Sequence, residues 1–269
     1  MNSLLQVILI AFVAGAVGTT IGGLLGIIKK KPSKAYISFM LAFAAGAMLG
    51  MALFEMAPAA ADVYHNGGLI PLLVGLGLGA VFVCGFDLIF HNRASTVLKK
   101  NHSEPKLETE LNKEEQQDIK DKRRLFKVGI AVFFAIMLHD LPEGIAIGGG
   151  YHVGISFAIG IVMLLHNIPE GLSIAVPLRA SGMKPYKIII ISFLAGVPAV
   201  IGAIIGFLIG GAADVLIPYV LAFAAGAMIY VVFSELLPTA YEYSKKNHLT
   251  TLLVLTGAVM IMIFAHALH

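Results

Sequence analysis

The chain has 269 residues, of which 58% are hydrophobic and only 13% are charged, and its formal net charge at pH 7 is +3. Soluble domains carry about 25% charged residues, so this composition excludes a soluble globular protein and indicates an integral membrane protein. We therefore expect the lipid bilayer as its surroundings and no nucleic-acid partner. The single cysteine, Cys84, excludes an internal disulfide framework.

Eight apolar stretches are each long enough to cross about 30 Å of hydrocarbon as a helix of about 20 residues. They cover residues 4–28, 36–58, 68–91, 125–149, 153–178, 187–210, 215–241 and 249–267. The first stretch is followed, not preceded, by a lysine cluster, which argues against a cleaved signal peptide. The sequence predicts an all-α, polytopic membrane protein whose residues 1–269 form one transmembrane domain with eight helices.

Lysine and arginine are distributed very unevenly between the predicted loops. All 19 lie in or beside the first, third, fifth and seventh loops, and the other loops and both termini have none. Since cytoplasmic loops carry the excess of basic residues, we expect a multi-pass protein of the cell membrane with both termini outside the cytoplasm. The third loop, about residues 93–126, mixes both charge signs and is expected to be a solvated, partly helical cytoplasmic linker.

An internal repeat organises the two ends of the chain. The octapeptide LAFAAGAM occurs at residues 41–48 and again at 221–228, and the same offset of 180 pairs Glu55 with Glu235. The register holds over three spans, which disfavours chance recurrence of small packing residues. Equivalent helices lie five spans apart, an odd number, so the two copies cross the membrane in opposite directions. An inverted repeat of helices 1–3 and 6–8 around a central helix 4/5 pair is characteristic of secondary transporters.

Two related hexapeptides, HDLPEG at residues 139–144 and HNIPEG at 166–171, lie 27 residues apart near the middle of the fourth and fifth helices. In a helix, the histidine and glutamate at i and i+4 project from one face, and Asp140 or Asn167 lies three residues before the same glutamate. An ionisable group at this depth costs about 2.5 to 3.5 kcal/mol, so such groups usually mark a pathway or a site.

These side chains form a predicted metal site. Imidazole nitrogen and carboxylate oxygen suit Zn²⁺ or Fe²⁺ better than Mg²⁺. One divalent ion would be held by His139, Glu143, His166 and Glu170, and the glutamates could bridge to a second ion held by Asp140 and Asn167. Pro142 and Pro169 lack an N–H and would free carbonyls along the path. The alternative is two kinked helices joined by buried His–Glu hydrogen bonds without an ion.

Three further residues are secondary candidates. Met48 in the second helix could add a thioether ligand, although methionine in an apolar helix is more often packing. Glu55 and Glu235, near the ends of the repeat-related second and seventh helices, could line an entrance and an exit, or could be polar residues near the interface.

With its paired H-x-x-P-E-G motifs, eight predicted spans and long third loop, the sequence resembles the ZIP (Zrt/Irt-like) family of divalent metal transporters, in its bacterial zinc-uptake and GufA-like branch. The resemblance implies uptake of Zn²⁺, with Fe²⁺, Mn²⁺ and Cd²⁺ as further substrates, through a binuclear site, and makes a homodimer plausible. It implies that the first ion is bound by His139, Glu143, His166 and Glu170, with Met48 as a neighbour, and the second by Asp140, Asn167, Glu143 and Glu170.

The chain departs from the family pattern at two positions. Family members often have asparagine where Asp140 stands, and the extra carboxylate is expected to alter ion preference or to permit proton coupling. Many also have glutamate before a proline in the sixth span, where this chain has Val197 before Pro198. We therefore expect the second ion to bind weakly or not at all.

Two other function classes compete with transport. An intramembrane metal-dependent hydrolase would also use a buried ion, but the chain lacks the H-E-x-x-H spacing and an enzyme does not need the repeat. A metal-gated or receptor-like protein would bind the ion without net flux. There is no P-loop, so ATP is not expected to be the direct energy source.

Overall fold

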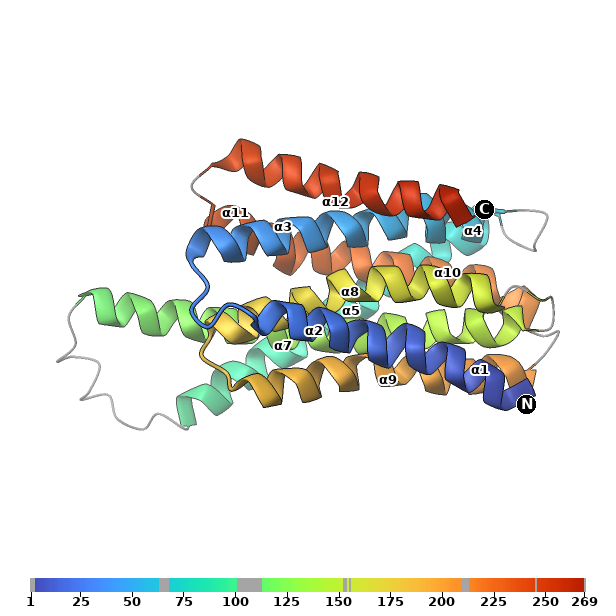
Figure 1. Ribbon diagram of the computed structural model, residues 1–269, viewed down its shortest axis with the longest axis horizontal. Coiled ribbons are helices and arrows are strands. Elements are labelled where there is room, and N and C mark those ends of the chain that lie inside the picture. The colour runs from blue at the N-terminus through green and yellow to red at the C-terminus, as the bar shows by residue number, and fades with distance from the viewer. Residues whose placement is uncertain are drawn as a thin grey trace.

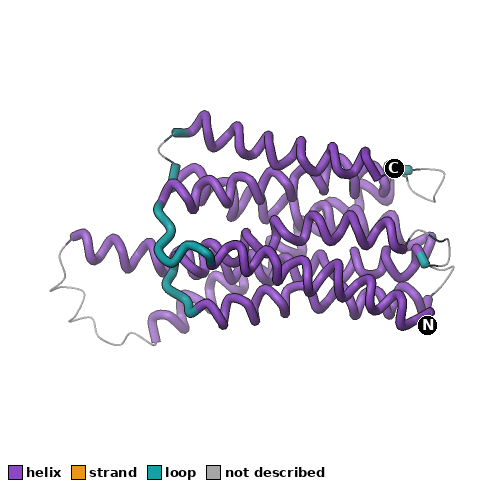
Figure 2. Tube along the Cα trace, in the orientation of Figure 1, coloured by secondary structure: helices purple, strands orange, loops and turns teal. Residues whose placement is uncertain are grey.

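The computed structural model describes residues 3–62, 68–100, 113–151, 154, 156–209, 213–244 and 246–268. Within these ranges the chain is helical apart from short connections, as Figure 2 shows. Eight of the described helical segments are long and apolar enough to cross a membrane. The predicted all-α fold with eight spans is therefore confirmed.

The spans are built from elements that follow the chain in order. Spans 1 to 3 consist of α1 (Ser3–Phe12), the π-helix η1 (Val13–Val17) and α2 (Gly18–Ile27); α3 (Lys34–Met51), the π-helix η2 (Ala52–Met56) and α4 (Ala57–Ala61); and α5 (Leu69–Lys100). Spans 4 to 8 consist of α7 (Lys113–Gly150); α8 (Ser156–Ala180); α9 (Pro185–Ile209); α10 (Ala213–Val231), the π-helix η5 (Val232–Leu236) and α11 (Leu237–Glu242); and α12 (Asn247–Leu268).

The start of α1 and the end of α12 lie at the same end of the helix bundle (Figure 1). The described connections from α2 to α3, from α8 to α9 and from α11 to α12 lie at the opposite end, where α7 also begins (Figure 2). An even number of membrane crossings explains why both ends of the chain lie together. The same arrangement brings the connections that contain lysine and arginine to the opposite end, as the charge pattern predicts.

The inverted repeat is visible in the local helix geometry. The π-helices η2 and η5 are separated by 180 residues, the offset of the repeated octapeptide. A π-helix has hydrogen bonds between residues five apart in place of four and is rare, so finding it at the same register in both copies is a structural match and not only a sequence match. The short helices that follow, α4 and α11, lie at opposite ends of the bundle (Figure 1), as inversion requires.

Glycine packing explains how the helices pair. Spans 4 and 6 pack closely at Gly144, where an added Cβ atom would collide with the backbone carbonyl of Ala199. Spans 5 and 1 pack in the same way at Gly171, where an added Cβ atom would collide with the carbonyl of Thr19. The carbonyls are themselves 180 residues apart. The glycine that ends each hexapeptide is thus a helix-packing residue, a role that sequence analysis did not assign.

The repeated octapeptide has the same function on the other side of the bundle. Gly46 of α3 packs against the Val254 carbonyl of α12, and Gly226 of α10 packs against the Leu76 carbonyl of α5. Small residues of this kind allow membrane helices to approach closely.

Gly46→Ala is expected to lower the free energy of unfolding by about 1 to 3 kcal/mol, because the new methyl group overpacks a contact between two backbones. Thermal unfolding of the purified protein in detergent micelles measures this. Gly77→Ala on α5 is the matched control, because a Cβ there has no neighbour within 4 Å. Equal melting temperatures for the two variants would contradict the packing role.

The long polar segment between spans 3 and 4 is helical at both of its described ends. α5 continues to Lys100 and α7 begins at Lys113, so α7 starts well before the predicted boundary at residue 125. Glu114 and Glu115 in the first turn of α7 favour this start through the helix dipole. The sequence predicts a partly helical linker here, but apolar runs mark only the part of a helix inside the membrane, so they do not show that the linker helix is continuous with span 4.

The extension of α7 docks onto spans 2 and 7 through charged side chains. Asp121 forms an ion pair with Lys34 at 2.8 Å, and Arg124 forms one with Glu242. The Lys34 ammonium also lies over the ring of Tyr243, 5.5 Å from its centroid. Burial, with the Asp121 carboxylate nearby, raises the pKa of the Tyr243 phenol above its ordinary value. Surface pairs of this kind each contribute little, about 0 to 1 kcal/mol, and both pairs join the extension to the bundle.

Candidate metal centre

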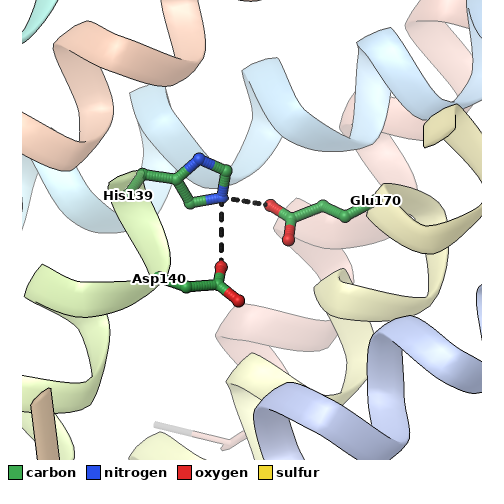
Figure 3. Close-up of side chains that lie close together, drawn as sticks. All are labelled: His139, Asp140 and Glu170. Atoms are coloured by element: carbon green, nitrogen blue, oxygen red, sulfur yellow. Dashed lines mark hydrogen bonds and ion pairs between the residues drawn. The ribbon is translucent and has the colours of Figure 1, made fainter. Parts of the chain in front are cut away.

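α7 and α8 pack against each other, and side chains of their two hexapeptides are in contact. Both helices continue through their motif prolines, Pro142 and Pro169. Figure 3 shows His139 and Asp140 of α7 facing Glu170 of α8. The Nε2 atom of His139 lies 2.8 Å from Oε1 of Glu170 and 3.4 Å from Oδ1 of Asp140. The two motifs therefore meet inside the bundle, as predicted.

A second pair crosses in the reverse direction. Nε2 of His166, on α8, lies 3.0 Å from Oε2 of Glu143, on α7. Each helix thus directs its histidine at the glutamate of the other helix. The contact is reciprocal because the two motifs are related by the pseudo-symmetry of the fold.

The other ring nitrogen of each histidine is held by its own helix. Nδ1 of His139 donates to the carbonyl of Ala135, and Nδ1 of His166 donates to the carbonyl of Val162, both at 3.0 Å. A carbonyl cannot donate, so Nδ1 must carry the hydrogen. The Nε2 lone pair is then the one available to an ion, which is the usual arrangement for metal-binding histidines.

The motif side chains are removed from solvent, with exposed fractions between 0% and 3% for His139, Asp140, Glu143, His166, Asn167 and Glu170. Five of their oxygen atoms have no hydrogen-bond partner among the described residues, namely both carboxylate oxygens of Asp140, Oε1 of Glu143, Oε2 of Glu170 and Oδ1 of Asn167. Buried acceptors without a donor are expensive and uncommon. A cation among them would remove that penalty.

Three of these donor atoms are close enough together to share one ion. Ligand atoms of His139, Asp140 and Glu170 all lie within 4.8 Å of one another. One imidazole nitrogen and two carboxylate oxygens form a mixed set of the kind that binds Zn²⁺ and similar divalent transition metals.

A match to a protein family agrees with this chemistry. Residues 87–265, which include both motifs and both central helices, match the family model described as ZIP zinc transporter. The chain belongs to the ZIP zinc transporter family. The resemblance seen in the sequence is thereby confirmed.

Curated relatives extend the ZIP match to nearly the whole chain. The zinc transporter ZupT of Clostridium perfringens is 33% identical over 278 residues, which cover 98% of this chain and 96% of the relative. The zinc transporters ZupT of an Enterobacter species and of Salmonella heidelberg are 32% and 33% identical, and each alignment covers 90% of this chain and 89% of the relative.

The secondary candidates occupy different places in the ZIP fold. Met48 is buried on α3, in the main hydrophobic core, and its role as a ligand remains a prediction. Glu55 lies in η2 and Glu235 in η5. Glu235 lines a cavity of about 20 Å³ together with Ala135, whose carbonyl holds His139. That volume accommodates about one water molecule, and Glu235 therefore borders a small, mostly apolar space one helical turn from the motif.

Span 6 carries a valine before its proline. Val197 precedes Pro198 within α9, and this helix contains no aspartate or glutamate. The carboxylates of the buried cluster therefore all come from α7 and α8.

Proposed function

We propose that this ZIP protein carries Zn²⁺ across the cell membrane into the cytoplasm, using the buried cluster on α7 and α8 as its ion site. The observation that carries the proposal is the crossed pair of His–Glu contacts, surrounded by buried oxygen atoms without donors. The names of three curated relatives, each a zinc transporter ZupT, support zinc as the substrate.

The ligand assignment in this proposal is the one that the family motifs imply. His139, Glu143, His166 and Glu170 bind the first ion, with Met48 as a neighbour, and Asp140 and Asn167 share a weaker second ion with the two glutamates. Fe²⁺, Mn²⁺ and Cd²⁺ are alternative substrates, because they accept the same nitrogen and oxygen donors. The protein lies in the cell membrane with both termini outside the cytoplasm, and a homodimer is its proposed assembly.

The helix pairing supports a way in which the ion site could change sides. Spans 1, 4, 5 and 6 are joined by glycine contacts around the site, and α3, α5, α10 and α12 pack with one another. In an inverted repeat, exchange between two equivalent conformations turns an outward-facing state into an inward-facing one. We propose that spans 4 and 5, with their packing partners, shift against the other helices.

Zinc flux into proteoliposomes tests the proposal. Vesicles containing the purified full-length chain and a trapped zinc indicator are expected to fill faster than protein-free vesicles, and added Cd²⁺ is expected to compete. Zinc binding without flux would favour a receptor-like protein. Zinc-dependent hydrolysis without flux would favour the hydrolase.

A further inference from the structure

Asn167 makes a contact that its counterpart Asp140 does not make. Its amide nitrogen, Nδ2, donates to the backbone carbonyl of Ala14 at 2.8 Å, which ties α8 to span 1 across 153 positions of sequence. Reversing the amide would place oxygen against oxygen, so the chemistry fixes this orientation. Because the two amide atoms diverge from the same carbon, the oxygen Oδ1 points away from Ala14, and it has no partner among the described residues.

The carbonyl of Ala14 accepts this bond because span 1 is locally a π-helix. Ala14 lies in η1, and the backbone N–H of Gly18 at the end of η1 bonds to Val13 and Gly15. In a regular α-helix that N–H would bond to the carbonyl four residues earlier, which is the carbonyl of Ala14. The extra residue of the π-helix diverts the usual donor, and Asn167 supplies a replacement.

Span 1 also leaves room for the asparagine. A Cβ atom added at Gly18 would lie 2.9 Å from the Cβ atom of Asn167, closer than two carbon atoms can pack. Asn167 itself is completely buried. The Ala14 carbonyl and the bare backbone of Gly18 together form a fitted cradle for this side chain.

The symmetry-related position has no such cradle. By the offset of 180, Ala14 and Gly18 correspond to Leu194 and Pro198 of α9, which contains no π-helix in its described length. Asp140, the counterpart of Asn167 in the other motif, has no donor to give, and neither of its oxygens has a hydrogen-bond partner among the described residues. The two motifs are therefore not interchangeable.

We propose that the amide nitrogen of Asn167 anchors this ligand to the π-helix of span 1 and so holds its oxygen Oδ1 in place, and that this anchor sets how tightly the site binds its divalent ion. The inference rests on the proposed function, because the affected quantity is the affinity for Zn²⁺. It assigns η1 a purpose, which is to present one carbonyl to the neighbouring motif.

Two variants and an exchange test the anchor. Gly18→Ala displaces Asn167 without replacing any ligand side chain, and Asn167→Asp keeps an oxygen but removes the donor. The exchange variant Asn167→Asp with Asp140→Asn keeps both the charge and the ligand types of the site. All three variants are expected to raise the KM for ⁶⁵Zn uptake about 10- to 100-fold, which is the usual effect of losing a contact that orients a metal ligand. Gly77→Ala is the control for an added methyl group.

A second measurement separates positioning from loss of folding. Co²⁺ bound to the purified protein reports its coordination geometry by visible absorption, and the spectrum is expected to change in Gly18→Ala while the melting temperature shows a folded protein. A wild-type KM in the exchange variant would overturn the proposal, as would a wild-type Co²⁺ spectrum in folded Gly18→Ala. If Gly18→Ala does not fold, the exchange variant still decides. Absence of zinc uptake by the wild-type chain would instead contradict the proposed function, and the Co²⁺ spectra would still test the anchor.

Discussion

Replacing Glu143 or His166 by alanine is expected to abolish uptake of ⁶⁵Zn into proteoliposomes. Each substitution removes a proposed ligand and also leaves its partner on the other helix buried without a counterpart. Loss of one member of a buried charged pair costs about 3 to 5 kcal/mol, so ion binding and helix packing are both affected.

Matched controls show whether the effect belongs to the site. His248→Ala and Glu114→Ala remove the same side-chain types from exposed positions on α12 and α7 and are expected to leave uptake near the wild-type rate. Uptake by Glu143→Ala or His166→Ala equal to that of the controls would refute the site.

Asp140→Asn is expected to stabilise the zinc-free protein and to weaken its response to zinc. Both carboxylate oxygens of Asp140 are buried without a hydrogen-bond partner among the described residues. Replacing the charge by a neutral amide relieves a penalty of about 1 to 3 kcal/mol, as is common where function requires an unfavourable residue.

Melting temperatures with and without Zn²⁺ measure both parts of this prediction. A ligand at 100 times its Kd stabilises a protein by about 2.7 kcal/mol, and Asp140→Asn should show a smaller increase than the wild type at the same zinc concentration. Lower stability of zinc-free Asp140→Asn, or an unchanged zinc response, would show that Asp140 is a structural residue.

The sequence was sufficient to predict the spans and the face of the motifs. A transmembrane helix is defined by the length and polarity of its own residues, so a single chain carries that signal. The i, i+4 spacing of His139 and Glu143 likewise places both on one face of α7. The spacing does not show which side chain each residue contacts. His139 contacts Glu170 of α8 and not Glu143 of its own helix, and this pairing depends on how the two helices pack.

Local irregularities could not be predicted either. The residues of η1, VAGAV, are unremarkable in an apolar helix, and their π-helical geometry becomes meaningful only beside Asn167. Similarly, the requirement for glycine at Gly144 and Gly171 comes from carbonyl groups on other spans. These features arise between helices, where a pattern within one helix carries no information. For η2 and η5, the sequence repeat predicts that the two segments are equivalent, but it does not predict that both are π-helices.

If the crossed histidine–glutamate pairs bind the ion as proposed, they also set the charge of the protein when it returns without zinc. Since each Nδ1 already holds a hydrogen, a contact of 2.8 or 3.0 Å between Nε2 and a carboxylate oxygen requires one proton between them. A divalent ion that binds all four side chains displaces both protons, so the site gains two positive charges and loses two. The net charge of the site is then the same with zinc as without it. We therefore expect membrane voltage alone to have little effect on the rate of transport.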